Sequence, residues 1–502
     1  MKEKENDMIF KSNGDGTCDL EMVVEYSGEE MIIPSVSPTG EKVIGIKKIW
    51  TEYKNKRHKY KKVVIPDGVE YLFEHAFITV SIDMVIIPKS LKQIYGNPFR
   101  HSNVKKIIID PNNEYYYSEG NCLIERKTKK MIAGTKYSII PNNVSEIGDS
   151  AFEGLMIKDI SIPNSVKTIG SSAFFRCQKL ENISIPNSVK TIGRYAFEYC
   201  ENLKNINLPE DLENISNFAF ANSGLESIFI PKNVSSIKVT VFSQCYKLKK
   251  IEVDPENKRY YSKNNCLIEK ETEKLIAALY NLNLEIPNGV KIISSFLVHY
   301  DVIFNSSISS KRKYGLPIEE RISSIVIPET VEIIESKAFQ YTNIKKLFIP
   351  KNVKCISDSA FSTNIYLESL VVDKDNDYYY SEGNCIIEKA TKKIVAATKN
   401  SVIPEGVVEI PEGTFHSLST IEKIRIPESV KIIRGGAFEF CDSLRELYVP
   451  KNLEVFEETL LSDKCKIYYG GTEEEWDKLA PWYKRNKELF NTKTKIFFSN
   501  NP

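Results

Sequence analysis

One phrase, returning at a fixed spacing, decides the fold. It stands three times in succession as ISIPNSVKTIGSSAFFRCQKLEN from Ile160, ISIPNSVKTIGRYAFEYCENLKN from Ile183 and INLPEDLENISNFAFANSGLES from Ile206. The prolines of these copies are 23 residues apart. Self-similarity at such a period is the signature of a repeat architecture, in which each unit is one small supersecondary element.

The same proline and a phenylalanine mark the repeat along most of the chain. Outside the three copies, the proline recurs at Pro34, Pro66, Pro88, Pro141, Pro231, Pro287, Pro328, Pro350, Pro404, Pro427 and Pro450. A phenylalanine follows eleven residues later in most copies, at Phe77, Phe99, Phe152, Phe174, Phe197, Phe220, Phe242, Phe339, Phe361, Phe415 and Phe438. Many copies of one unit therefore account for the 502 residues better than three domains of about 150 residues each.

Within a unit, the spacing predicts a short strand followed by a turn. Ile183 and Ile185 alternate with outward residues, as in a strand with one buried face. Pro186 lacks a backbone donor and ends the strand, while Ala196 and Phe197 are expected in a short helical turn. One unit cannot bury its apolar side chains alone, so stacked units should form a parallel solenoid. We predict a right-handed curved rod of about 16 turns, roughly 80 Å long at ~4.8 Å per strand.

The unit resembles the BspA-like class of leucine-rich repeats, in which proline replaces the usual asparagine after the strand and an Ala-Phe turn lies on the outer face. The resemblance runs from about Phe10 to the C-terminus. It implies a leucine-rich repeat solenoid, mostly β with short 3-10 or helical turns. It also implies adhesion to host or matrix proteins and to other bacteria.

The chain divides into a repeat region and two ends that should cap it. We expect an N-terminal β cap in residues 1–50, repeats in 51–465 and a C-terminal cap in 466–502. In the C-terminal cap, Thr472 and Glu475 have the spacing of a capping box ahead of a helix, and a last strand begins at Lys495.

Four segments depart from the period. Three enlarged units each carry a predicted β-hairpin, near residues 110–140, 254–286 and 373–403. The polar, Ser-rich segment 299–321 is predicted to be an exposed loop.

Composition and charge exclude several classes of partner. The 68 basic and 67 acidic residues leave a formal charge of +1, which argues against nucleic acid and anionic membranes as partners. No apolar stretch is long enough to span a membrane, so no membrane insertion is expected. The N-terminal MKEKENDMIF shows no secretory signal, so either the protein stays inside the cell or a signal has been removed. The localisation therefore stays open.

The residues that usually carry chemistry are placed by the repeat. Seven of the ten cysteines occupy repeat slots, and we interpret them as small buried thiols: Cys122, Cys177, Cys200, Cys245, Cys266, Cys385 and Cys441. No zinc spacing, phosphate loop or nucleophile motif occurs, so we expect no enzyme and no cofactor. Asp373, Asp375 and Asp377 imitate the start of a calcium loop, but Tyr378 replaces its glycine, and no metal site is expected.

A partner surface is expected on the outward side of the strands. The residue between the two inward aliphatic side chains is apolar towards both ends of the chain and polar in the centre. Exposed apolar rows tend to mark contact sites, although β-branched and aromatic residues also simply suit a sheet surface. The candidate partner-binding residues are Ile86, Ile108, Phe229, Val326, Phe348, Val371, Val402 and Tyr448.

The tyrosines of the enlarged units are a second candidate surface. They stand at 115–117, 260–261 and 378–380. Tyrosine combines a stacking face with a hydroxyl group, which suits protein or carbohydrate recognition. Alternatively, these rings pack beneath their own hairpins.

Two functions remain. The first is a non-catalytic, monomeric interaction protein that binds a protein or glycan through the strand face, in adhesion or cell-surface recognition, as the resemblance implies. The alternative is an intracellular scaffold for protein–protein interaction, which the missing signal and the free cysteines favour.

Overall fold

The computed structural model describes the chain in two compact units, Met1–Lys258 and Arg259–Pro502. The described residues are 7–26, 28–49, 59–279, 283–295, 322–340, 342–362, 364–418, 420–462, 464–483 and 495–498. The predicted loop at 299–321 lies outside them. The division between the two units falls inside the second enlarged repeat. It does not correspond to a boundary between cap and repeats, so the cap boundaries at 50 and 466 stay predictions.

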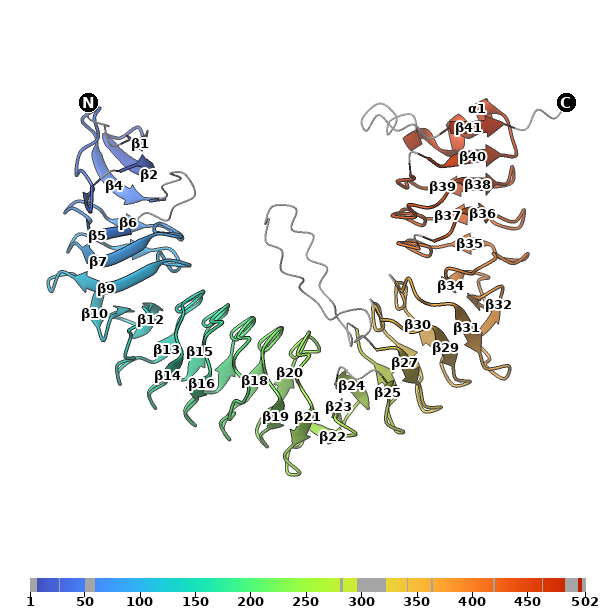
Figure 1. The fold of residues 1–502 in the computed structure, drawn as a ribbon, viewed down its shortest axis with the longest axis horizontal. Coiled ribbons are helices and arrows are strands. Elements are labelled where there is room, and N and C mark those ends of the chain that lie inside the picture. Colours follow the sequence, from blue (N-terminus) through green and yellow to red (C-terminus); the bar gives the residue numbers. More distant parts are fainter. Residues whose placement is uncertain are drawn as a thin grey trace. The chain divides into compact units, whose positions relative to one another are not determined.

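Each unit is a stack of short, mostly parallel strands, as predicted for a solenoid (Figure 1). The described residues form about 18 turns rather than the predicted 16. The difference arises at the ends, because strands of both expected caps continue the stack. Met31 of the N-terminal region pairs in parallel with Val63, and Leu447 pairs in parallel with Ile467 of the C-terminal region.

Most of the described turns contribute to two ladders of strands. The first ladder holds the strand that precedes the repeat proline, and its outward side is called the strand face below. In the first unit this ladder comprises β3 (Glu30–Ile32), β5 (Lys59–Val64), β7 (Ser81–Ile87), β9 (Asn103–Ile109), β14 (Asp159–Ser161), β16 (Asn182–Ser184), β19 (Ser227–Ile230) and β21 (Lys250–Val253). In the second unit it comprises β25 (Asn283–Glu285), β27 (Ser324–Val326), β29 (Lys346–Ile349), β31 (Ser369–Val372), β36 (Lys423–Arg425), β38 (Glu446–Val449), β40 (Lys466–Tyr469) and β41 (Lys495–Phe498).

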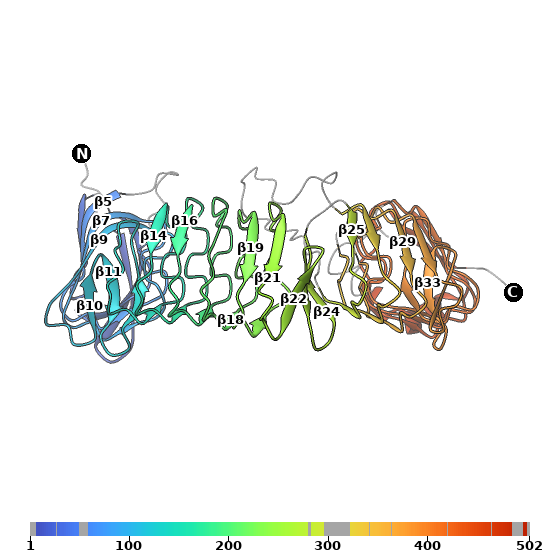
Figure 2. The same cartoon turned by 90° about the horizontal axis from the view of Figure 1, so that it is seen from below.

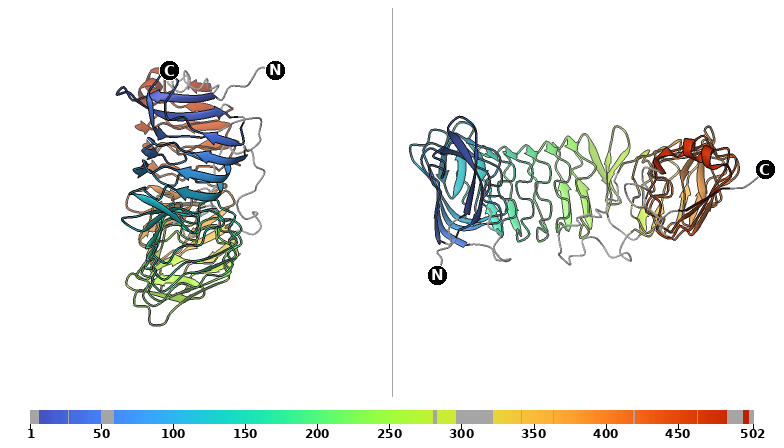
Figure 3. Two further views of the ribbon diagram at one scale, coloured as in Figure 1. Left: turned by 90° about the vertical axis from the view of Figure 1, so that its left-hand side faces the viewer. Right: turned by 90° about the horizontal axis from the view of Figure 1, so that it is seen from above.

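The second ladder consists mostly of two-residue strands that follow the proline, and its first two members are longer and precede Pro34. In the first unit it comprises β1 (Asp7–Ser12), β2 (Thr17–Glu25), β4 (Lys42–Ile46), β6 (Tyr71–Leu72), β8 (Gln93–Ile94), β13 (Glu146–Ile147), β15 (Thr168–Ile169), β17 (Thr191–Ile192), β18 (Asn214–Ile215) and β20 (Ser236–Ile237). In the second unit it comprises β26 (Ile292–Ile293), β28 (Ile333–Ile334), β30 (Cys355–Ile356), β35 (Glu409–Ile410), β37 (Ile432–Ile433) and β39 (Val455–Phe456). Figure 3 shows the blue strands of the first unit stacked one above another.

Strand pairing places each repeat position directly on its copy in the next turn. Ile160 pairs with Ile183, and Ser161 pairs with Ser184. Neighbouring strands such as β19 and β21 run side by side in the same direction (Figure 2). Identical slots therefore form continuous columns of like side chains.

The repeat phenylalanines form such a column in the core. Phe174, Phe197 and Phe220 are fully buried, with ring centroids 5.2 and 5.6 Å apart and planes within 5° of parallel. The turns around them are hydrogen-bonded turns rather than the expected helical ones. Ser172 and Arg176 adopt left-handed φ values of 55° and 58°, which interrupt any helix. Alternate amides bond to the next turn instead, as from Phe174 N–H to the Ala196 carbonyl at 2.8 Å.

The enlarged units contain the predicted hairpins and one more strand each. The hairpin predicted from Cys122–Glu125 and Met131–Ala133 is formed by β11 (Cys122–Glu125) and β12 (Lys130–Ala133), and β10 (Tyr116–Glu119) adds a third antiparallel strand. The other two units repeat this arrangement as β22 (Tyr260–Lys263), β23 (Cys266–Glu269) and β24 (Lys274–Ala277), and as β32 (Tyr379–Glu382), β33 (Cys385–Glu388) and β34 (Ile394–Ala396).

The C-terminal region confirms the predicted capping box. Helix α1 (Glu473–Leu479) begins after Thr472, whose hydroxyl accepts the Glu475 N–H at 3.3 Å. The Glu475 carboxylate accepts the Thr472 N–H at 2.8 Å. Trp476 of this helix is buried. The strand predicted to begin at Lys495 is observed as β41.

Candidate functional site

Seven of the eight candidate residues lie on the strand face, and Val402 lies outside any strand, beside the third hairpin. Five are strongly exposed, with exposed fractions of 71% for Val402, 59% for Val326, 50% for Phe348, 48% for Phe229 and 46% for Val371. Ile86, Ile108 and Tyr448 are half-buried. Period-two alternation explains the placement of the residues in strands, since their flanking aliphatic residues are buried, apart from the half-buried Ile325 before Val326.

In the first unit, strand pairing joins two of the candidates into an apolar row. Ile86 pairs with Ile108 across β7 and β9, and with Val64 of β5 on its other side. Val64 in turn pairs with Ile32, which is 63% exposed. Sequence reasoning missed Ile32 because it was assigned to the cap. Phe229 stands apart from this row, because its pairing partner on β21 is the polar Glu252.

In the second unit, pairing joins Phe348 directly to Val371 across β29 and β31. Val326 pairs with Glu285 in the sheet of β25 and β27. Between Val371 and Val402 the third hairpin intervenes, because the Val402 N–H donates to the Gly383 carbonyl at 2.9 Å. On the other side of the hairpin, the Ser381 hydroxyl accepts the Val372 N–H at 3.0 Å. The third hairpin therefore separates Val402 from the pair of Phe348 and Val371.

The centre of the first unit is polar, as predicted, and it is hollowed. A groove of about 470 Å³ is lined mainly by small polar side chains on and beside β14 and β16. Asn182 Nδ2 donates to Asp159 Oδ1 at 2.7 Å across its floor. The polar lining residues are Asp159, Ser161, Asn182, Ser184, Asn205 and Asn207.

A row of stacked aromatic side chains lies on the strand face of β36, β38, β40 and β41. The Arg425 guanidinium lies 4.3 Å from the centroid of the Tyr448 ring. Tyr448 stacks on Tyr468 at 4.7 Å, and Tyr468 stacks on Phe497 at 5.1 Å. We call these four residues the aromatic row. They line a groove of about 280 Å³ together with neighbouring residues, including Glu428 and Pro450.

Sequence reasoning found only the first aromatic ring of this row. Tyr468 and Phe497 belong to the segment that was interpreted as a cap, which lacks the repeat proline and the Ala-Phe pair. The signal that could have found them is the alternation in KIYY and KIFF, which repeats that of ELYV around Tyr448.

A row of charged residues runs beside the aromatic row, two residues earlier on each strand. Lys423 Nζ lies 3.1 Å from the Glu446 carboxylate, which also accepts the Tyr448 hydroxyl at 3.0 Å. Hydrogen bonds from Lys423 and Tyr448 hold the pKa of Glu446 below its usual value. Lys466 and Lys495 continue this row by strand pairing.

Some tyrosines of the enlarged units pack beneath their hairpins, and others are exposed at the surface. Tyr116 and Tyr379 are buried, and their hydroxyl groups accept the backbone N–H groups of Ile94 and Ile356 at 3.0 and 2.9 Å. Burial raises the pKa of Tyr379 to about 12. The preceding residues, such as Tyr115 at 44%, are exposed. The central tyrosine of a cluster is therefore a packing residue.

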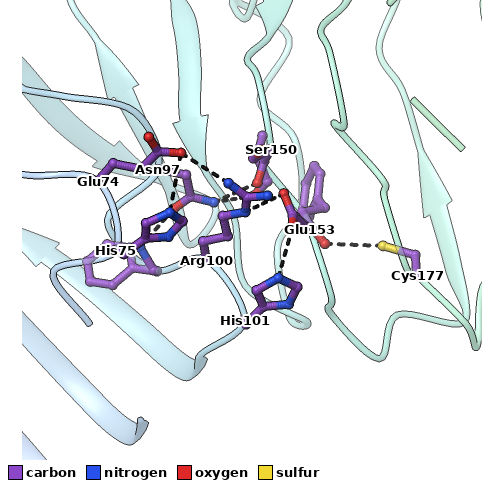
Figure 4. A network of polar contacts seen from close by, with 11 residues as sticks. Glu74, His75, Asn97, Arg100, His101, Ser150, Glu153 and Cys177 are labelled. Carbon is purple, nitrogen blue, oxygen red and sulfur yellow. Dashed lines mark hydrogen bonds and ion pairs between the residues drawn. The ribbon is translucent and has the colours of Figure 1, made fainter. Parts of the chain in front are cut away.

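A cluster of ionisable groups lies beside the first enlarged unit (Figure 4). The Glu153 carboxylate is fully buried and lies 2.6 Å from Arg100 Nε and 2.9 Å from His101 Nε2. Burial alone would raise the pKa of Glu153, but contacts from His101, Arg100 and Ser150 outweigh it and lower the pKa. Arg100 also pairs with Glu74 at 3.2 Å. Through its two ion pairs, the Glu153 carboxylate joins the turn of Arg100 and His101 to its own turn.

The thiols are equally engaged by the fold. All ten cysteines are free, and nine are buried. Cys177, Cys200 and Cys245 each donate to the carbonyl of the phenylalanine one turn earlier, at 3.1, 3.3 and 2.9 Å. Burial raises the pKa of Cys245 to about 12, so these thiols are poor nucleophiles at neutral pH.

The apparent calcium loop is a turn closed by its own aspartate. Asp373 Oδ1 accepts the Asp375 N–H at 2.9 Å, and Asp110 makes the equivalent bond to Asn112. Within the described ranges, no group of three or more His, Cys, Asp or Glu side chains is placed to hold a metal ion. No helix of this part of the chain is long and apolar enough to cross a membrane.

Comparison with known families identifies the repeat. Residues 51–132, 130–249, 279–391 and 386–470 match the family profile of the BspA type leucine rich repeat region. The chain belongs to the BspA-type leucine-rich repeat family. Family members of this fold are typically not enzymes. No curated protein sequence matches this BspA-type protein.

Three solved structures are similar to this BspA-type chain at low sequence identity. A leucine rich cell surface protein from Faecalibacterium prausnitzii is 19% identical, with 95% of this chain and 96% of that chain covered and a TM-score of 0.39. The pneumococcal vaccine antigen PcpA is 18% identical over 99% and 98%, with a TM-score of 0.37. A leucine-rich repeat protein from Bacteroides ovatus is 18% identical over 100% of both chains, with a TM-score of 0.35.

Proposed function

We propose that this BspA-type protein is a non-catalytic, monomeric interaction protein that binds a protein or glycan through the strand face, in adhesion or cell-surface recognition. The observation that supports this function is the pair Phe348 and Val371. These side chains lie side by side on β29 and β31 and remain about half exposed. Exposed apolar side chains gathered in one place are a feature of contact sites.

The test replaces this pair by charge. We expect Phe348→Asp with Val371→Asp to weaken partner binding at least about tenfold, because a central apolar contact is worth about 1–2 kcal/mol or more. The control is Phe440→Asp, since Phe440 is 53% exposed and lies in an Ala-Phe turn, away from the strand face. Partners captured from host-cell and bacterial extracts, and a glycan array, supply the ligands. Equal binding by both variants and the unaltered protein would overturn the proposal.

A second candidate function is an intracellular scaffold with the same binding surface. The nine buried free thiols favour it, because they fit a reducing compartment. Cell fractionation distinguishes the two. Recovery in the cytosolic fraction supports the scaffold, and recovery on the cell surface supports adhesion.

A further inference from the structure

We propose that the aromatic row is a docking site for an acidic extended peptide segment of a partner protein. This inference rests on the proposed function and names the chemistry of the partner at one place on the strand face. The site consists of Arg425, Tyr448, Tyr468 and Phe497, with Lys466 and Lys495 on the adjacent row.

The charge of this surface is incompletely balanced. Two carboxylates lie at this surface. Glu446 pairs with Lys423 and attracts Lys466 at longer range. The Glu428 carboxylate accepts Asn452 Nδ2 at 3.0 Å and keeps its negative charge. By contrast, Arg425, Lys466 and Lys495 have no carboxylate within ion-pair distance in the part of the chain that the structure describes. Because carboxylates complement such cations, the expected partner carries Asp or Glu.

The stacking fixes Arg425 in an orientation that suits recognition. Its guanidinium lies over the Tyr448 ring at 4.3 Å, and the ring is held from behind by Tyr468. A guanidinium stacked in this way keeps its donors free in the plane for a bidentate contact with a carboxylate. Little conformational entropy is then lost when the partner binds.

The rings favour a peptide over a carbohydrate. Tyr448 is stacked between Arg425 and Tyr468, and Tyr468 is stacked between Tyr448 and Phe497, so the faces of both tyrosines are covered and their edges reach solvent. A sugar ring needs an open aromatic face, whereas apolar side chains pack against ring edges. The groove of about 280 Å³ beside these edges has room for such side chains. Tyrosine and arginine are also the residues that most often carry binding energy at protein interfaces.

The test selects a displayed library of random linear peptides on the full chain. We expect enrichment of sequences that combine Asp or Glu with apolar or aromatic residues. Arg425→Gln should weaken binding of the enriched peptides at least about tenfold, and Tyr468→Ser should weaken it as well. Lys478→Gln is the control, because it removes the same charge from the exposed surface of α1. Binding should also weaken as salt rises.

Four results would overturn the inference. Enriched peptides without acidic residues would contradict the chemistry, and equal binding by the Arg425→Gln and Lys478→Gln variants would contradict the site. Heparin oligosaccharides that bind in an Arg425-dependent way, with no acidic peptide enriched, would assign the site to an anionic glycan. The double variant Phe348→Asp with Val371→Asp separates the two proposals. If it abolishes partner capture while Arg425→Gln and Tyr468→Ser leave capture unchanged, the proposed function stands and this inference fails.

Discussion

The buried carboxylate of Glu153 allows a prediction whose size and pH dependence both follow from its surroundings. Glu153→Gln keeps the shape of the side chain but removes the charge that pairs with Arg100 and His101. Breaking a fully buried ion pair costs about 3–5 kcal/mol, and an exposed pair contributes about 0–1 kcal/mol. The side chains of Arg100 and His101 are 27% and 30% exposed and can be partly rehydrated. We therefore expect a loss of about 2 kcal/mol.

Hydrogen–deuterium exchange measures this loss locally. A decrease of about 2 kcal/mol in the opening free energy corresponds to roughly 30-fold faster exchange around residues 97–103 and 150–155. The control is Glu181→Gln, which removes a surface pair with Lys158 at 3.3 Å and should change exchange by less than about fivefold.

The pH dependence has a definite sign. The pKa of Glu153 is lower in the folded than in the unfolded protein, so its stabilisation is fully present above the unfolded pKa of about 4.3. It is lost as the pH falls through the folded pKa. The difference between the unaltered protein and the Glu153→Gln variant should shrink below about pH 4. A variant indistinguishable from Glu181→Gln, or a difference that grows in acid, would refute the reasoning.

Three further predictions concern the core. At pH 8, a thiol reagent should modify one cysteine per native chain, the exposed Cys355, and should modify all ten cysteines after unfolding. Rapid reaction of several thiols in the native protein would contradict the burial of the other nine. Gly193→Ala should cost about 2 kcal/mol in urea unfolding, because the new Cβ would lie 2.5 Å from the Gly170 carbonyl carbon. Gly435→Ala, whose nearest contact is 3.4 Å, is the matched control and should unfold nearly as the unaltered protein does. Phe197→Ala should cost about 3–5 kcal/mol and lower exchange protection mainly in adjacent turns; uniform loss along the chain would contradict nearest-neighbour stacking.

The repeat positions could be predicted from the sequence because each marker has one physical role. The proline ends a strand, and the phenylalanine fills the core, so their spacing fixes both the register and the inward side of every strand. The capping box at Thr472 was equally local, since both of its hydrogen bonds join residues three apart.

The features that the sequence did not reveal depend on pairing between distant segments. Tyr468 and Phe497 join the strand face only because β40 and β41 pair onto β38. Val402 is separated from Val371 by a hairpin tip that bonds to it across the fold. The first enlarged unit has no Ala-Phe turn, so the turns before and after it lie next to each other on that side. Glu153 therefore forms an ion pair with Arg100, although the two residues are far apart in the sequence.

The central claim is that partners bind the strand face, and site-specific photo-crosslinking tests it most directly. A photoreactive phenylalanine analogue is placed at Phe348 in one protein and at Phe440 in another, since both positions are about half exposed. The account predicts a crosslinked partner at position 348 and none at 440. A partner crosslinked only at 440, or equally at both positions, would contradict it.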